Sequence, residues 1–237
     1  FGPLRVSMFV LVASPAVIIL MIGSIGVLGA GYFLRIARRD SVITASDRSR
    51  GPLKWQHGPM LSILTVAVAT GVVGGVLILA IPRVAEANGS IDASGFLFAA
   101  LAIGEVVGAV AYGAVRWSVP PSVQLMSALA FTGVMLTLSA LTLENLWLFG
   151  LLLLCIGAAA GPIAVLLASA TENAADAGSI GRASGLRISV SLAASAAGSA
   201  FAGGTSAALT APAVLLILAL VLAVSAALPL FARRVYV

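Results

Sequence analysis

The sequence predicts an all-α integral membrane protein with seven transmembrane helices. Of its 237 residues, 61% are hydrophobic and only 9% are charged, whereas about a quarter of the residues in an average soluble domain are charged. The apolar segments are rich in Ala, Leu, Val and Gly and mostly run for about 20 residues, the length that a helix needs to cross a bilayer. Strands of a membrane barrel would be about half as long and would alternate in polarity.

Seven apolar spans follow one another along the chain. We expect transmembrane helices at 8–34, 60–81, 95–115, 122–141, 146–168, 183–207 and 211–231. Pro82 is expected to close the second span, because proline lacks the N–H that continues helical hydrogen bonding. Pro120-Pro121 links the third span to the fourth, and Glu144-Asn145 makes a short turn before the fifth. The sixth span is the least hydrophobic because it is full of Ser, Ala and Gly.

The basic residues predict the orientation of the chain in a membrane. The segments 35–59, 116–121, 169–187 and the C-terminus hold six, one, two and two Lys or Arg residues, against only Arg5 and Arg83 on the other side. Basic residues concentrate in cytoplasmic loops. The loop 35–59 and the C-terminus are therefore expected in the cytoplasm and the N-terminus outside, in the inner or plasma membrane of the cell. The net charge of +5 is explained by this sidedness, so no nucleic-acid partner is expected.

Small residues spaced four apart predict close contacts between the helices. The pairs are Gly71/Gly75, Gly104/Gly108 and Gly157/Gly161, and the sixth span carries a stripe of Ser189, Ala193, Ala197 and Ala200. Such spacing lets helix backbones approach one another in lipid. We therefore expect a compact helical bundle.

Glu105 is the only acidic residue deep in a span, near the middle of the third. A charge at the bilayer centre costs about 2.5–3.5 kcal/mol on insertion scales, so such a residue is expected to face a bundle interior or a water-filled cavity. One interpretation is a carboxylate that titrates protons or binds a cation. The other is a protonated side chain that hydrogen-bonds a neighbouring helix for structural reasons.

Three further residues are candidates for a substrate or proton pathway. Arg187 lies about one turn into the sixth span; the favoured interpretation is that it snorkels to the cytoplasmic interface, and the alternative is a cavity cation that meets an anionic substrate or a carboxylate. Pro162 is expected to break the fifth span near its middle, which would suit a gating element or a structural bend. Tyr112, with Trp117, approaches the cytoplasmic interface, where aromatic residues are common.

The residues needed for common enzymes are missing. His57 is the only histidine and Cys155 the only cysteine, so neither a His/Cys metal site nor an intrachain disulfide is expected. No Ser–His–acid set can be assembled at membrane depth, and no phosphate-binding loop follows a strand. We therefore expect neither an enzyme nor a bound cofactor.

Five segments follow one another in an order that matches a known family: Gly2-Pro3, the basic loop 35–59, GEVVGAVAYGAVRW at 104–117, GPIAVLLASATENAA at 161–175 and GRASGLRISVSLAASAAGSAFAGG at 181–204. Together they resemble the major facilitator superfamily of transporters, specifically its bacterial drug- and solute-efflux members. In this family a long basic cytoplasmic loop joins two six-helix halves. The segment at 104–117 departs from the family pattern, because the family's Asp is absent and only Arg116 remains.

The resemblance implies three regions. Residues 1–34 correspond to the sixth helix, at the end of an N-terminal half; residues 35–59 to the loop between halves; and residues 60–237 to helices seven to twelve. Because the chain starts with Phe1, we expect a fragment that lacks most of the N-terminal half. The implied function is alternating access, proton-coupled, for small organic solutes or drugs. Besides the bilayer, the partners would be the solute, protons and the missing half.

The main alternative is a polytopic membrane protein that does not transport, such as a receptor-like protein, a scaffold or a subunit of a larger complex. A retinal-binding receptor is not indicated, since no Lys lies in a span. An ABC-type permease would need a cytoplasmic coupling helix, and none is evident. Five further spans upstream of Phe1 would favour the transporter, whereas a start codon just before Phe1 would favour the alternative.

Overall fold

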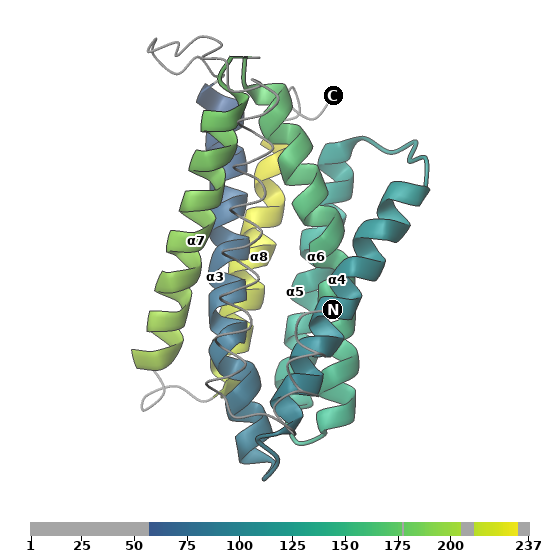
Figure 1. The fold of residues 1–237 in the computed structure, drawn as a ribbon, viewed down its shortest axis with the longest axis vertical. Helices are drawn as coiled ribbons and strands as arrows, with labels where there is room; N and C mark the ends of the chain where they lie inside the picture. The colour runs from purple at the N-terminus through teal and green to yellow at the C-terminus, as the bar shows by residue number, and fades with distance from the viewer. Residues whose placement is uncertain (1–56, 177, 205–210, 232–237) are drawn as a thin grey trace, which may run out of the picture. The chain divides into compact units, whose positions relative to one another are not determined.

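The structure is a computed structural model that describes residues 57–176, 178–204 and 211–231. These residues form six helices within one compact unit (Figure 1). In chain order the helices are α3 (His57–Ala87), α4 (Ala93–Ala114), α5 (Pro121–Leu141), α6 (Leu146–Ala174), α7 (Ile180–Gly204) and α8 (Ala211–Phe231). No strand occurs in the described part of the chain. The predicted span at 8–34 and nearly all of the loop 35–59 lie outside it.

Four of the helices, α3, α4, α5 and α6, are long and apolar enough to cross a membrane. Helix α7 is as long as its neighbours, but Arg182, Arg187 and several serines make it the least hydrophobic of the six. Helix α8 is apolar over Pro212–Leu222, the part whose side chains the structure describes. The protein is therefore all-helical where it is described, and its apolar helices are those of a membrane-embedded protein.

Three predictions about helix ends and breaks were wrong. Helix α3 continues through Pro82 to Ala87, and α6 runs on to Ala174 instead of ending at 168. Helix α6 is also unbroken across Pro162. A proline removes one N–H donor from the helical ladder, and the flanking hydrogen bonds continue on both sides because no water competes for them in an apolar surrounding.

Two turns at the same end of the helices are tied together by the side chain of Asn88, and Asn145 caps the helix that follows one of them. Gly89 follows the end of α3 with φ of 70°, a left-handed conformation that glycine adopts without strain. The side-chain amide of Asn88 donates to the carbonyl of Leu143, 2.9 Å away in the α5–α6 link. In that link the side-chain oxygen of Asn145 accepts from the N–H of Leu148 at 3.1 Å and caps α6.

The three predicted glycine pairs are confirmed as sites of close helix contact. A Cβ atom built on Gly75 of α3 would overlap the carbonyl of Ser195 in α7, and one built on Gly108 of α4 would overlap the carbonyl of Ala158 in α6. Gly161 of α6 meets α4 in the same way. The α3–α7 and α4–α6 pairs therefore touch backbone to backbone, the closest packing that helices achieve in lipid.

The small-residue stripe of the sixth span, unlike the glycine pairs, does not lie at a helix contact among the described residues. Its members Ser189, Ala193, Ala197 and Ala200 are all exposed. The buried small residues of α7 are Ala183, Ala194, Gly198 and Ala202. Helix α7 therefore packs on α3 through one face and leaves the stripe uncovered by the described residues.

The helix contacts show that the unit consists of two similar sets of three helices. Close pairs are α3 with α7, α4 with α6, and α5 with α8; smaller contacts join α5 to α6, α3 to α8, α3 to α6, α6 to α7 and α3 to α4. If α3 is exchanged with α6, α4 with α7 and α5 with α8, the same set of helix contacts results. Successive helices alternate in direction (Figure 1), so the two sets run in opposite directions. The unit is an inverted repeat.

The repeat extends to the register of individual residues. Gly75 meets the carbonyl of Ser195 in α7, and the corresponding Gly161 meets the carbonyl of Glu105 in α4. One turn earlier, Gly71 meets Ser191 and Gly157 meets Leu101. The two close helix pairs are therefore built with the same spacing, although the sequences of the two sets differ.

Replacing a contact glycine is expected to separate α4 from α6. Gly108→Ala should destabilise the protein by about 1–3 kcal/mol, because the new Cβ meets backbone that cannot rotate away. Gly113→Ala, in the same helix but with nothing within 4 Å, should not lower stability. The check is the thermal unfolding temperature of both variants in one detergent. An unchanged temperature for Gly108→Ala would contradict the close contact.

Candidate functional site

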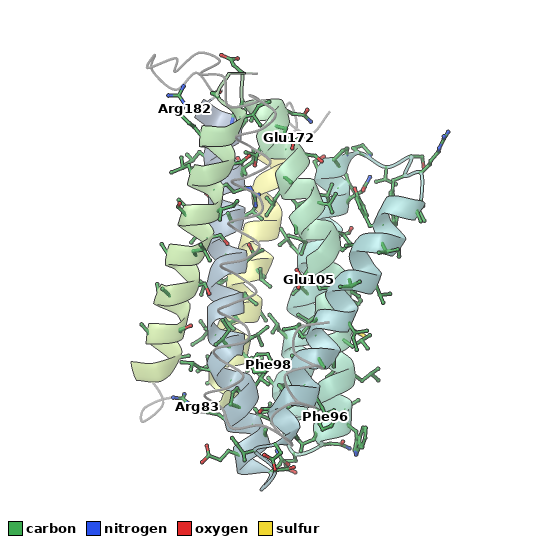
Figure 2. All side chains as sticks on the ribbon, in the orientation of Figure 1. Arg83, Phe96, Phe98, Glu105, Glu172 and Arg182 are labelled. Atoms are coloured by element: carbon green, nitrogen blue, oxygen red, sulfur yellow. The ribbon has the colours of Figure 1, made fainter. Side chains whose placement is uncertain are left out.

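The charged side chains of the described residues lie at the two ends of the helices, with two exceptions. Arg182 and Glu172 are at one end and Arg83 is at the other (Figure 2). The exceptions are Glu105, in an otherwise apolar stretch of α4, and Arg187, two turns inside the serine-rich α7. A buried or membrane-level charge is unfavourable without a compensating role. These two residues therefore mark the candidate site.

Glu105 and Arg187 line one cavity, which has a volume of about 280 Å³. All six helices contribute to its wall. The polar lining residues are Thr70, Glu105, Thr132, Arg187 and Ser191, and the others are aliphatic or glycine. An apolar pocket with a few convergent polar groups is the usual form of a small-molecule site.

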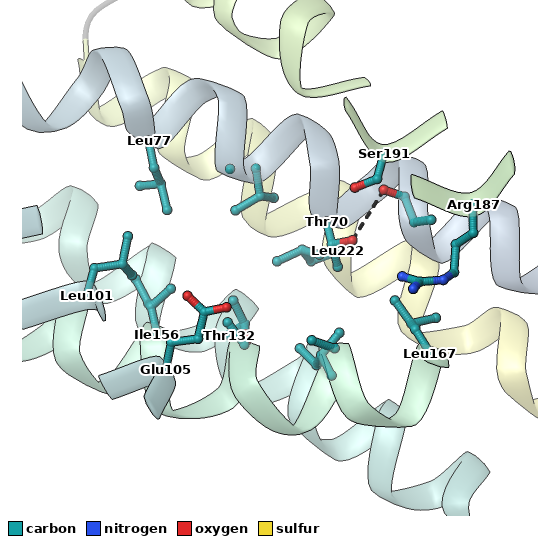
Figure 3. Close-up of a pocket in the computed structure, with 16 residues that line it drawn as sticks. Thr70, Leu77, Leu101, Glu105, Thr132, Ile156, Leu167, Arg187, Ser191 and Leu222 are labelled. Atoms are coloured by element: carbon teal, nitrogen blue, oxygen red, sulfur yellow. Dashed lines mark hydrogen bonds between the residues drawn. The ribbon is translucent and has the colours of Figure 1, made fainter. Parts of the chain in front are cut away.

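Arg187 reaches this cavity from α7, and its guanidinium group points inward beside Leu167 (Figure 3). It lies seven residues after the start of α7, about 10 Å along the helix. Its Nε is buried and has no hydrogen-bond partner among the described residues. Arg187 therefore lies at the cavity and not at the helix end, and the role of a cavity cation, the second of its two interpretations, stays a prediction.

Glu105 lies on α4, which runs from Ala93 to Ala114, so it is near the middle of its helix as predicted. It lines the cavity at a different place from Arg187, and the two side chains form no ion pair (Figure 3). Its carboxylate also makes no hydrogen bond to another described residue. The structural role considered for Glu105, a hydrogen bond to a neighbouring helix, is therefore not seen in the described part of the chain.

Tyr112 lies in a second hollow, a groove of about 640 Å³ between α4, α5 and α6. Its hydroxyl donates to Oε1 of Gln124 at 2.6 Å, and its ring stacks on Trp117 with centroids 5.6 Å apart. Nε1 of Trp117 donates back to the carbonyl of Tyr112 at 3.1 Å. These contacts fix the corner between α4 and α5, so they give Tyr112 a structural task.

Pro162 lines the same groove as Tyr112 and lies outside the cavity of Glu105 and Arg187. Because Pro162 has no N–H, the carbonyl of Ala158 one turn earlier loses its intrahelical donor. Gly108 of α4 packs directly against that carbonyl, where a Cα–H can approach it as a weak donor. The proline and the glycine together form one contact of the α4–α6 pair.

Three polar cavity residues, Thr70, Thr132 and Ser191, were not among the predicted site residues. The Thr70 hydroxyl donates to the carbonyl of Val66 and the Thr132 hydroxyl to that of Ala128, both at 2.9 Å. Hydroxyls bonded to their own helix are common in transmembrane segments, so the sequence alone does not distinguish them. For Ser191 one signal was available, since it lies one turn after Arg187 on α7; Thr70 and Thr132 lie on helices that carry no predicted site residue.

Comparison with profiles of known protein families, with characterised proteins and with solved structures finds no match to this chain. Its function is therefore argued from the helices and the cavity themselves.

The hydrogen bond of Tyr112 should contribute to stability and leave the cavity unaffected. Tyr112→Phe keeps the stacking on Trp117 and removes the hydroxyl, so we expect a loss of about 0.5–1.5 kcal/mol. A double-mutant cycle with Gln124→Ala, followed by thermal unfolding, should show that the two losses are not additive. Additive losses would contradict a direct bond between the two side chains.

Proposed function

We propose that this chain forms part of a secondary active transporter that resembles the major facilitator superfamily. The six described helices would be its C-terminal half. The segment 8–34 would be the last helix of an N-terminal half, and the loop 35–59 would connect the halves. The transporter would move small organic solutes or drugs across the inner or plasma membrane, driven by the proton gradient.

The observation that carries this proposal is the cavity between two inverted three-helix sets. Inverted repeats with a binding site between them are the architecture of many secondary transporters, in which alternating access follows from movement about a fixed site. A scaffold has no need of a cavity that all six helices line, and a receptor that binds a ligand in such a cavity has no need of the inverted repeat. The presence there of an acid and a base that do not pair favours a site that exchanges ligands.

The proposed mechanism assigns separate tasks to the two charged residues. Glu105, at the middle of α4, would carry the proton, because it is the one carboxylate that lines the cavity from the described residues. Arg187 would hold a fixed positive charge in the same cavity. Tyr112 and Pro162 line the separate groove, so they have no contact with solute in this mechanism.

The ends of the described helices are consistent with the proposed orientation. Arg116 and Arg182 flank the ends of α4 and α7 on one side of the unit, and Arg83 is near the end of α3 on the other. The side with more basic residues would be cytoplasmic. The basic loop 35–59 and the C-terminus would lie on that same side, with the N-terminus outside.

Alternating access predicts that the cavity is reachable from each side of the membrane in turn. Ser191→Cys, in the full-length protein with Cys155 and any other cysteine replaced, should react with a membrane-impermeant thiol reagent in both right-side-out and inverted vesicles. Ser191 lines the cavity, so its accessibility reports the cavity directly. The measurement is the labelled fraction in each vesicle preparation.

Glu144→Cys serves as the control, because Glu144 is exposed in the α5–α6 link. It should react from one face only. If Ser191→Cys also reacts from one fixed face, or from neither, a static receptor or scaffold explains the chain better.

Glu105→Gln should abolish solute accumulation driven by a pH gradient, because the amide cannot carry the proton. Exchange of the same solute without a gradient should persist, since exchange needs no net proton movement. Both are measured in proteoliposomes containing the full-length protein, with Glu144→Gln as the matched control. Accumulation that survives in Glu105→Gln would remove Glu105 from proton coupling.

A further inference from the structure

Arg187 presents a positive charge to the cavity without a partner in the described chain. Its Nε is buried and unpaired, and Glu105 forms no ion pair with it. An unsatisfied buried donor on a charged group is strongly unfavourable. Such a group is stable when an anion binds to it, and a guanidinium matches the two oxygens of a carboxylate better than any other side chain does.

We infer that the cavity binds a small organic anion with an apolar body, an inference that rests on the proposed transport function. The guanidinium of Arg187 holds the anionic group. Ser191 lies one turn further along α7, on the same face of the helix, and its hydroxyl makes no hydrogen bond to another described residue. It is placed to donate a second hydrogen bond to the anion.

The size and the remaining wall of the cavity define the rest of the ligand. A volume of about 280 Å³ is just below the roughly 300–1,000 Å³ of ligand pockets. Away from Arg187 the wall is aliphatic and includes Leu77, Ile156 and Leu222. An unbranched or branched aliphatic chain of a few carbons meets this wall without leaving polar groups unpaired.

Glu105 couples this anion to a proton. Glu105 and Arg187 are the only ionisable side chains lining the cavity from the described parts of the six helices. A negative charge on Glu105 repels an anion that is bound in the same cavity. Protonation of Glu105 removes this repulsion. By linkage, proton and anion then favour each other's binding, so both cross the membrane in the same direction.

The test is isothermal titration calorimetry of the full-length protein in lipid nanodiscs with four probes of equal chain length: hexanoate, hexanamide, hexylamine and 6-aminohexanoate. Hexanoate should bind at least about tenfold more tightly than the neutral amide or the amine. Arg187→Gln should weaken hexanoate binding by at least about tenfold, and Arg187→Lys by less, since it keeps the charge and loses the planar fork. Glu105→Gln should strengthen hexanoate binding several-fold.

The controls are Arg116→Gln and Glu144→Gln, both exposed outside the cavity, which should leave hexanoate binding unchanged. Equal binding of hexanoate and hexanamide to the unmodified protein would overturn the inference. The inference would also be overturned if 6-aminohexanoate bound more tightly than hexanoate and Glu105→Gln weakened its binding, because that result defines a site for a zwitterion.

The calorimetry and the Ser191→Cys labelling separate the two claims. Arg187-dependent hexanoate binding together with labelling from one fixed face would leave the anion site standing and remove the transporter. Labelling from both faces without hexanoate binding would leave the transporter standing and remove the anion site. Because Glu105→Gln is expected to gain affinity, its outcome is informative even if Arg187→Gln does not fold.

Discussion

The structure depends on direct backbone contact between helices at glycine. In water, burial of apolar side chains drives helices together, whereas lipid tails are as apolar as leucine and supply no such force. The close pairs α3–α7 and α4–α6 are therefore held by the many short contacts that Gly75 and Gly108 permit. Ser199 adds a hydrogen bond from its hydroxyl to the carbonyl of Gly75 at 2.8 Å. The cavity exists because these pairs are tight and the contacts between α3 and α6 are few.

Much of the fold could be predicted from the sequence, because apolar run length and glycine spacing are one-dimensional signals. The continuation of α3 beyond Pro82 and of α6 beyond residue 168 could not be predicted. The length of an apolar run reports the thickness of lipid that a helix crosses and not the length of the helix itself. Glu105 was identifiable because a single acid in an apolar span is rare. The direction in which the Arg187 side chain points could not be predicted, because a long side chain two turns from a helix end can reach either water or the interior of the bundle.

The rest of the site required knowledge of which helix faces meet. Ser191 and Thr132 look like ordinary small polar residues of transmembrane helices, and only the packing of α7 and α5 brings them to one cavity. Tyr112 is the opposite case, because its residue type and its position near a helix end suggested a pathway residue. Its hydroxyl is bonded to Gln124 across the α4–α5 corner, a pairing that no local pattern predicts.

The inverted repeat has an energetic consequence. If the protein is the proposed transporter, a helix arrangement that is the same from both sides of the membrane would give its two conformations, each the counterpart of the other, similar helix packing. The two charged residues are not repeated in the other set of helices. In the register of the close helix pairs, Ser195 occupies the position that corresponds to Glu105. Leu97 occupies the position that corresponds to Arg187, one turn before Ser191. Near-degenerate states respond to small forces, so in the proposed transporter a single proton or anion would be enough to decide which of them is populated.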